Sequence, residues 1–237
     1  MNLFADVLML AAALALGYAA VLGAARLPIF PLREVVVKKP LREVTAMQIE
    51  YAANNAVSGN FFTVNLDAVR AAFEKLPWVR KASVRRRWPG GIELDIEEHV
   101  AAARWKHADG SEARLVNTEG DVFAAASSAK LPLFVGPEDS APEILARYHE
   151  LSELMTGIDR QPQSLALSLR QAWQVRLDDG MLIELGRDQA KAPVRERLVR
   201  FLAVYREAGE KLRAKAEVVD LRYPNGYAVR LARAGSR

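Results

Sequence analysis

The sequence predicts an α+β fold: a single N-terminal transmembrane helix, then a β-α-α-β-β domain, then a mixed β-sheet domain with flanking helices. Three patterns predict it. The first is an apolar run from Leu3 to Ala25. The other two, over 82–96 and 173–185, are alternations of apolar and polar residues on both sides of a turn, as in β-hairpins. Helical patterns precede both hairpins, so we expect a membrane segment at 1–27 and domains at 28–101 and 102–237.

The apolar run is long enough to cross a bilayer as a helix. About twenty apolar residues span the roughly 30 Å hydrocarbon core, and Asp6 is the only charged residue before Arg26. A cleaved signal peptide has a basic start and a shorter apolar run, whereas no Lys or Arg precedes this one. Leu22-Gly23-Ala24 still fits a weak cleavage site, and a buried core helix is the third alternative. We expect a membrane anchor between Leu3 and Ala25.

The orientation of this anchor is ambiguous from charge alone. The positive-inside rule would place the basic end of a span in the cytoplasm, and the basic residues here follow the span. Either a basic cytoplasmic tail precedes this sequence, or the large downstream part is exported despite its charge. We favour export. The basic residues are Arg26, Arg33, Lys38, Lys39 and Arg42.

The first domain begins with a strand, expected at Leu32–Val37. Thr45 and Gln48 form a capping-box pattern, which predicts the start of a short helix. Asn65 is suited to cap a second helix, which Pro77 ends. The hairpin over 82–96 then completes the domain.

The basic run Arg85-Arg86-Arg87 could suggest phosphate binding, and Arg85 and Arg87 fall on the polar side of that hairpin. Glu93, Asp95 and Glu97 occupy the same side of the next strand. Cross-strand pairs of opposite charge are common on a solvated sheet face. We therefore do not expect a nucleic-acid site, which needs an unopposed basic surface.

The second domain is rich in strands. Turn signals surround short strands at 115–117 and 122–123. Ser140 and Glu143 form another capping-box pattern and predict a helix over about 141–155. The hairpin over 173–185 follows.

An amphipathic helix is expected from about Ala192 to Lys211, with Val194, Leu198 and Phe201 on its buried side. The chain then ends in a strand at Tyr227–Leu231. A terminal strand with a free edge can accept another chain. We expect four arginines of the helix to lie on a solvated face: Arg195, Arg197, Arg200 and Arg206.

The residue types argue against catalysis and against a cofactor or metal site. The chain of 237 residues has no cysteine, which excludes disulfides, zinc–thiolate sites and cysteine nucleophiles. Its net charge is only +4. The histidines His99, His107 and His149 are widely separated. Glu97-Glu98-His99 is better explained by the outer face of a strand than by a metal site. No assembled catalytic constellation or small-molecule site is evident.

Several motifs resemble the FtsQ family of bacterial cell-division proteins, over nearly the whole chain and in the same order. The first group resembles the POTRA domain of that family: Phe30-Pro31-Leu32-Arg33, Gly59-Asn60-Phe61-Phe62, Leu76-Pro77-Trp78-Val79 and Ser83 to Pro89. The second group resembles its β domain: Leu115-Val116-Asn117 with Gly120, Trp173, Leu185-Gly186-Arg187 and Val219 to Gly226.

The resemblance implies a bitopic inner-membrane protein with a cytoplasmic N-terminus and its bulk in the periplasm. Members of the family are division-site scaffolds that bind the FtsB–FtsL pair and act with FtsK, FtsW and FtsI. FtsB docks on the edge of the last strand of the β domain. The resemblance thus implies a non-enzymatic role at the septum.

The resemblance also implies site residues. Leu231 stands where the family has a tryptophan, so that aromatic anchor is replaced here. For upstream partners such as FtsK, the matching hairpin positions are Lys81, Val84 and Arg86. For FtsB, the matching positions are Arg170, Arg222, Tyr223, Asn225 and Gly226, followed by the strand residues Tyr227, Val229 and Leu231.

Two other functions stay open at this point. POTRA domains also occur in factors for outer-membrane protein assembly or secretion, although no lipid-facing strands of a membrane barrel are evident after Arg104. A periplasmic enzyme acting on peptidoglycan is the second alternative.

Overall fold

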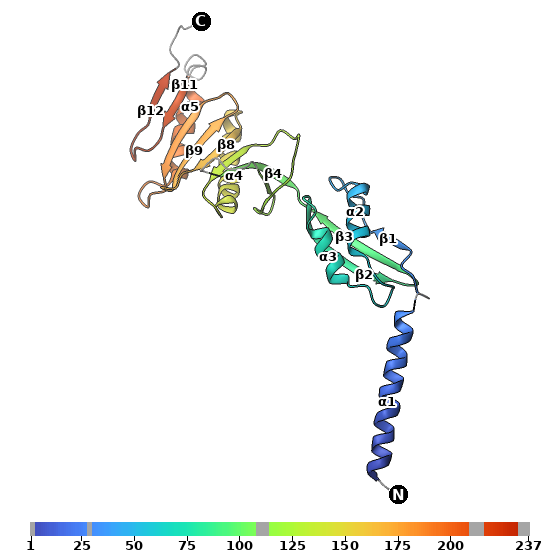
Figure 1. Ribbon diagram of the computed structural model, residues 1–237. Coiled ribbons are helices and arrows are strands. Elements are labelled where there is room, and N and C mark those ends of the chain that lie inside the picture. The colour runs from blue at the N-terminus through green and yellow to red at the C-terminus, as the bar shows by residue number, and fades with distance from the viewer. Residues whose placement is uncertain (1–2, 28–29, 108–113, 209–215, 232–237) are drawn as a thin grey trace. The chain divides into compact units, whose positions relative to one another are not determined.

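The computed structural model describes residues 3–27, 30–107, 114–208 and 216–231 (Figure 1). The chain divides into two compact units, Met1–His99 and Val100–Arg237. Both combine helices with β-sheet, which confirms the predicted α+β class. The turn at 109–110 and the predicted end of the last helix near Lys211 lie outside the described residues.

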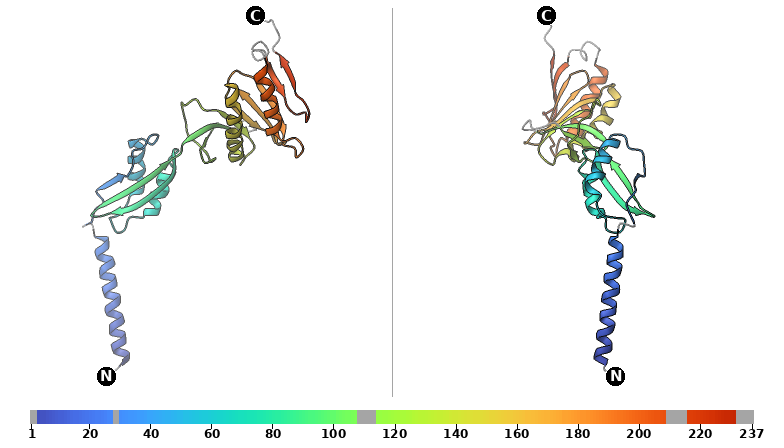
Figure 2. Two further views of the ribbon diagram at one scale, coloured as in Figure 1. Left: turned by 180° about the vertical axis from the view of Figure 1, so that it is seen from behind. Right: turned by 45° about the vertical axis from the view of Figure 1, so that its right-hand side comes forward.

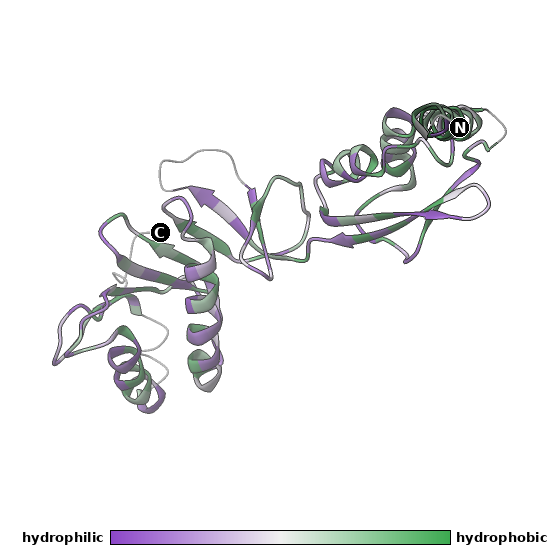
Figure 3. Cartoon of the chain, turned by 90° about the horizontal axis from the view of Figure 1, so that it is seen from below, coloured by the Kyte–Doolittle hydropathy of each residue, from purple (hydrophilic) through white to green (hydrophobic). Residues whose placement is uncertain are grey.

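The first element is helix α1 (Leu3–Arg26). Its segment Phe4–Ala24 is long and apolar enough to cross a membrane, and Figure 3 shows it predominantly green, the colour of hydrophobic residues. The described side chains of the helix are exposed. Exposure of so many apolar groups in water would be unfavourable, so this helix fits a membrane span.

The rest of the first unit is a three-stranded sheet covered by two helices. Its elements are β1 (Glu34–Val37), α2 (Ala46–Ala56), α3 (Leu66–Glu74), β2 (Val79–Arg87) and β3 (Gly91–Glu98). The strand order is β1-β3-β2, with β1 parallel and β2 antiparallel to β3. Val69 and Phe73 of α3 share one hydrophobic core with Ile92 and Leu94 of β3, and all four are fully buried. The order of elements is the predicted one.

Both helix starts predicted in this unit are confirmed. The Gln48 main-chain N–H donates to the Thr45 hydroxyl at 3.3 Å, and the Thr45 main-chain N–H donates to the Gln48 side-chain oxygen at 2.9 Å. The Asn65 side chain accepts from the Ala68 N–H at 3.0 Å. These contacts satisfy main-chain donors that the first turn of a helix leaves unpaired.

The second unit is built on one long sheet, whose described strands follow the order β12-β11-β10-β9-β8-β7-β4-β5-β6. Helices α4 (Ala141–Met155) and α5 (Val194–Glu207) and the short 3₁₀ helix η1 (Thr156–Ile158) complete it. The strands are β4 (Ala101–His107), β5 (Arg114–Asn117), β6 (Val122–Phe123), β7 (Leu133–Gly136), β8 (Pro162–Leu167), β9 (Ala172–Leu177), β10 (Leu182–Arg187), β11 (Ala216–Asp220) and β12 (Ala228–Leu231).

The pairing register aligns apolar side chains in one row across six strands. Because side chains alternate between the two faces of a strand, every member of the row points to the same face. Buried residues of α4 and α5 belong to the same core cluster, so both helices cover that face. The row runs Phe134, Leu165, Val175, Ile183, Val219 and Val229.

Two predictions for this unit are wrong. Ser140 precedes α4, but its hydroxyl makes no capping contact. It donates instead to the Pro137 carbonyl at 2.7 Å. Arg197 was expected on the solvated face of the last helix, yet it is 4% exposed. Position 197 follows Val194 by three residues and precedes Phe201 by four, which places it on the apolar face.

Candidate partner-binding site

The last strand, β12, is one edge of the sheet in the second unit. It pairs antiparallel with β11 alone among the described strands, through Val218–Arg230, Val219–Val229 and Asp220–Ala228. One side of its main chain therefore has no strand beside it within the described residues. An added strand could pair there by β-augmentation, in which main-chain hydrogen bonds give affinity and side-chain pockets give specificity.

The loop that leads into β12 is fixed to the sheet at its start. The Leu221 N–H donates to the Glu184 carbonyl at 2.9 Å, and the Leu221 side chain is buried. The Arg222 guanidinium holds the Asp220 carboxylate in a two-pronged contact, with its Nε at 2.9 Å from Oδ1 and its Nη2 at 2.6 Å from Oδ2. It also lies 3.2 Å from the Glu184 carboxylate.

These contacts shift the pKa values of Asp220 and Arg222 so that the charged form of each group is favoured. Hydrogen bonds from the Arg222 side chain lower the pKa of Asp220 against the opposing effect of burial. The hydrogen bond to Asp220 and the charges of Asp220 and Glu184 raise the pKa of Arg222. The pair is thus fully ionised near neutral pH and orients the start of the loop.

Two arginines of α5 hold the same loop from the helix side. Arg197 donates to the main-chain carbonyls of Leu221, Arg187 and Ala192. Arg200 donates to the Pro224 carbonyl at 2.9 Å. Neither role was expected from the sequence. For Arg197, its helical spacing within the apolar stripe was the one signal in the sequence that could have revealed its buried position.

An apolar groove lies between α5 and the last two strands. The Tyr227 ring packs edge-on against Phe201, with 5.4 Å between the centroids. Val204 and Leu231 remain 47% and 43% exposed, so apolar surface borders the free edge. A cavity of about 30 Å³ in the groove is lined by Phe201, Val204, Tyr205, Ala208, Ala216, Val219, Tyr227 and Val229.

The opposite face of the sheet brings together two residues that were predicted separately. Arg170, between β8 and β9, and Arg222 line one open pocket of about 610 Å³, together with Trp173, Glu184 and Gly186. Tyr223 is 55% exposed, and Asn225 and Gly226 are exposed beside it. The candidate site therefore combines a free strand edge, an apolar groove on one face and an arginine-lined pocket on the other.

The second candidate set, in the first unit, divides in two. Lys81 and Val84 line a shallow groove of about 290 Å³ between α3 and β2, and β2 is an edge strand of its sheet. The Arg86 guanidinium is engaged elsewhere, because it donates to the carbonyls of Phe61 at 2.7 Å and Val64 at 2.9 Å. Lys81 and Val84 thus line a groove beside a sheet edge, whereas Arg86 holds a loop.

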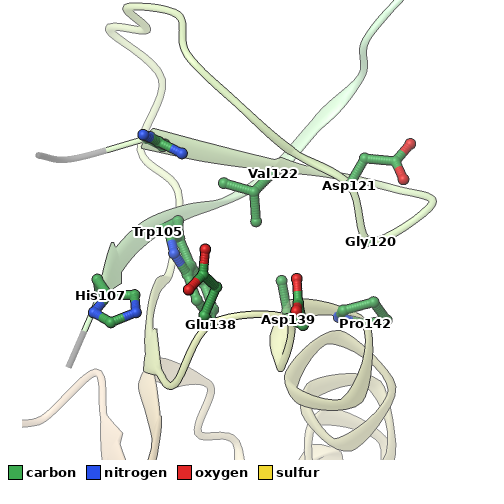
Figure 4. A pocket seen from close by; sticks show the side chains of 10 residues that line it. Trp105, His107, Gly120, Asp121, Val122, Glu138, Asp139 and Pro142 are labelled. Atoms are coloured by element: carbon green, nitrogen blue, oxygen red, sulfur yellow. The ribbon is translucent and has the colours of Figure 1, made fainter.

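A pocket of about 710 Å³ lies near the other end of the long sheet (Figure 4). Trp105 and His107 line it from β4, and Asp121, Glu138 and Asp139 line it from loops. Among the described residues, no group of three histidine, aspartate or glutamate side chains is placed to hold a metal ion. We assign this pocket no chemistry.

Comparison with known proteins gives matches over both units. The model for the C-terminal part of the cell division protein FtsQ/DivIB matches residues 103–222. The model for the FtsQ-type POTRA domain matches residues 30–99.

Full-length relatives agree with these matches. Cell division protein FtsQ of Nitrosospira multiformis is 37% identical over 235 residues, which cover 97% of this chain and 96% of the relative. FtsQ of Burkholderia pseudomallei is 38% identical over 86% of this chain and 81% of the relative. FtsQ of Bordetella pertussis is 34% identical over 98% and 90% of the two chains.

Proposed function

Because the chain belongs to the FtsQ family of cell-division proteins, we propose that it is a non-enzymatic scaffold of the divisome. It binds the FtsB–FtsL pair at the septum and links early division proteins such as FtsK to late ones such as FtsW and FtsI. The observation that carries this proposal is the free edge of β12, with exposed Tyr223 beside it.

The proposed mode of binding is strand addition. A segment of FtsB pairs with the main chain of β12 and lays apolar side chains against Tyr227, Val229 and Leu231. Arg170 and Arg222, which line one pocket on the opposite face, engage acidic groups of the same segment. Leu231 is 43% exposed and supplies aliphatic contact where the family has a tryptophan.

The proposed location is the bacterial inner membrane, crossed once by α1, with a cytoplasmic N-terminus and the bulk in the periplasm. The apolar segment Phe4–Ala24 supports a single span. Part of the basic charge after the span is paired, since Lys38 and Lys39 lie 3.2 and 3.5 Å from the Asp95 carboxylate. The proposed domains are residues 28–101 and 102–237.

A titration tests the docking edge. The full chain in lipid nanodiscs is titrated with the periplasmic segment of FtsB from the same organism, with wild type compared to Tyr223→Ala. Loss of a binding hot spot costs about 2 kcal/mol or more, or about thirtyfold in Kd. Tyr51→Ala is the control, since Tyr51 is 71% exposed on α2 in the other unit.

Saturable binding that Tyr223→Ala weakens and Tyr51→Ala leaves unchanged is the expected result. Equal affinity of all three proteins would contradict the edge model. If none of the three proteins binds although each is shown to be folded, the result would favour the alternative function, a POTRA-containing factor for outer-membrane protein assembly or secretion. The match of residues 103–222 to the FtsQ/DivIB family favours division over that alternative.

A further inference from the structure

Four aromatic residues form one cluster at the start of the first globular domain; we call Phe30, Phe61, Phe62 and Trp88 the aromatic cluster. Their rings meet edge to face, with centroids 5.0 Å apart for Phe30–Phe62, 5.2 Å for Phe61–Phe62 and 5.7 Å for Phe61–Trp88. Phe61 is only 7% exposed, whereas Phe62 and Trp88 are 45% and 68% exposed. Two large rings thus face outward from a buried base.

The cluster is tied to the end of α1. The Leu27 N–H donates to the Ala24 carbonyl in the last turn of the helix at 3.2 Å, and the Asn60 side chain donates to the Leu27 carbonyl at 2.9 Å. The Phe61 N–H donates to the Phe30 carbonyl at 2.9 Å. Because four residues of extended chain reach at most about 14 Å, Phe30 stays within that distance of Arg26 at any angle between helix and domain.

The outward rings are held in place before any partner arrives. Arg86 donates to the carbonyls of Phe61, Phe62 and Val64. The Asn60 side-chain oxygen accepts from the N–H groups of Phe62 and Thr63, each at 3.0 Å. A loop fixed by this many contacts loses little conformational entropy when its side chains bind a surface.

The residues around the cluster fit the headgroup layer of a bilayer. Tryptophan concentrates at membrane–water interfaces, where its amphipathic ring is stable. Phenylalanine is common on apolar faces that are buried at the boundary between headgroups and acyl chains. Arg33 and Arg87 both lie beside the turn between β2 and β3, which also carries Trp88. The Arg33 N–H donates to the Gly90 carbonyl in this turn at 2.9 Å, and the Arg87 side chain is 52% exposed. Figure 2 shows the hairpin of β2 and β3 in two further views.

We propose that Phe62 and Trp88 insert into the interfacial layer of the bilayer that holds α1, so that the first globular domain docks on the membrane surface through the aromatic cluster. The partner is the phospholipid surface itself. This proposal rests on the proposed membrane insertion of α1. Its consequence is that the domain adopts a preferred orientation to the membrane instead of turning freely about the linker.

Site-specific fluorescence quenching tests this docking in the full chain. Because the sequence contains no cysteine, the substitutions Trp88→Cys, Lys75→Cys and Leu14→Cys each give one position for a bimane label. The proteins are placed in nanodiscs of phosphatidylethanolamine and phosphatidylglycerol with brominated acyl chains. Position 14 reports insertion of α1. Position 75 is the control, since it precedes β2, whose nine residues separate it from Trp88 by about 30 Å.

The label at position 88 is expected to be quenched by brominated lipid, at a depth about 5–10 Å into the headgroup and acyl boundary. The label at position 75 is expected to remain unquenched. Adding Phe62→Asp to Trp88→Cys should lower the quenching at position 88 about twofold or more, because a charge opposes insertion. Adding Tyr51→Asp, at another exposed aromatic position, should leave the quenching unchanged.

The two proposals fail in distinguishable ways. Quenching at position 14 without quenching at position 88 would overturn surface docking and leave the membrane anchor intact. Absence of quenching at both positions would overturn the anchor and the docking together. A label at position 88 that is shielded from aqueous iodide but not quenched by lipid would show that protein covers the cluster, which also overturns lipid docking.

Discussion

The guanidinium of Arg197 donates a hydrogen bond to the carbonyl of Leu221, although 24 residues separate them in the chain. Arg197 lies in the first turn of α5, and Leu221 directly follows β11. The contact therefore couples the helix to the loop from which the candidate binding edge begins. The site that we propose for a division partner depends on a buried cation that does not itself face the partner.

Removal of this cation is predicted to destabilise the second unit. Arg197→Met keeps the apolar volume but leaves three carbonyls without their donor, at a cost of about 2–4 kcal/mol. Hydrogen exchange of the full chain should show faster exchange of the Leu221 amide. Arg195→Met is the control, since Arg195 is 60% exposed and pairs with Glu150 at 3.5 Å. Equal exchange in both variants would contradict a supporting role for Arg197.

The Asp220–Arg222 pair predicts a specific dependence on pH. The pKa of Asp220 is lowered in the folded protein, mainly by hydrogen bonds from Arg222. Its contribution to stability is therefore present above the unfolded pKa of about 3.9 and is lost as pH falls through the folded value. Urea unfolding of wild type and Asp220→Asn should differ near pH 7, and the difference should shrink below about pH 4. A constant difference across this range would refute the assignment.

Arg86 is predicted to stabilise the first globular domain, and this is expected to be its main role instead of contact with a partner. Arg86→Met removes the donor to three loop carbonyls and should cost about 2–3 kcal/mol in unfolding free energy. Arg85→Met is a matched control, because Arg85 is 62% exposed and makes an ion pair with Glu93 worth less than about 1 kcal/mol. Lys81→Ala should leave stability unchanged. Similar losses for the Arg85 and Arg86 variants would argue against the loop-holding role.

Gly120 is predicted to be less replaceable than Gly180, although both have positive φ angles, of 92° and 88°. A Cβ on Gly120 would lie 3.0 Å from the Pro142 Cα, whereas a Cβ on Gly180 would meet nothing within 4 Å. Gly180→Ala should cost about 1 kcal/mol for its backbone conformation, and Gly120→Ala about 1 kcal/mol more for the contact with α4. Thermal unfolding measures both, and equal costs would show that the contact relaxes freely.

The sequence by itself determined the features that depend on neighbouring residues. The length of the run from Leu3 to Ala25 was sufficient to indicate a span, and the alternation over 82–96 and 173–185 specified both hairpins. The caps at Thr45 and Asn65 were equally predictable, because a capping side chain and the main-chain N–H that donates to it are three residues apart. The motifs of the FtsQ family then identified the second unit as a domain of that family, whereas local patterns alone predicted only its strands and helices.

Only the tertiary structure decided how distant segments share contacts. It paired β11 with β10 in parallel, and β12 with β11, so that β12 became the edge. It buried Arg197, engaged Arg86 with loop carbonyls and turned the Ser140 hydroxyl toward Pro137. Periodicity specifies which face of an element is apolar, but not what covers that face. The partners of a long polar side chain are set by whichever carbonyls the packed chain brings within reach.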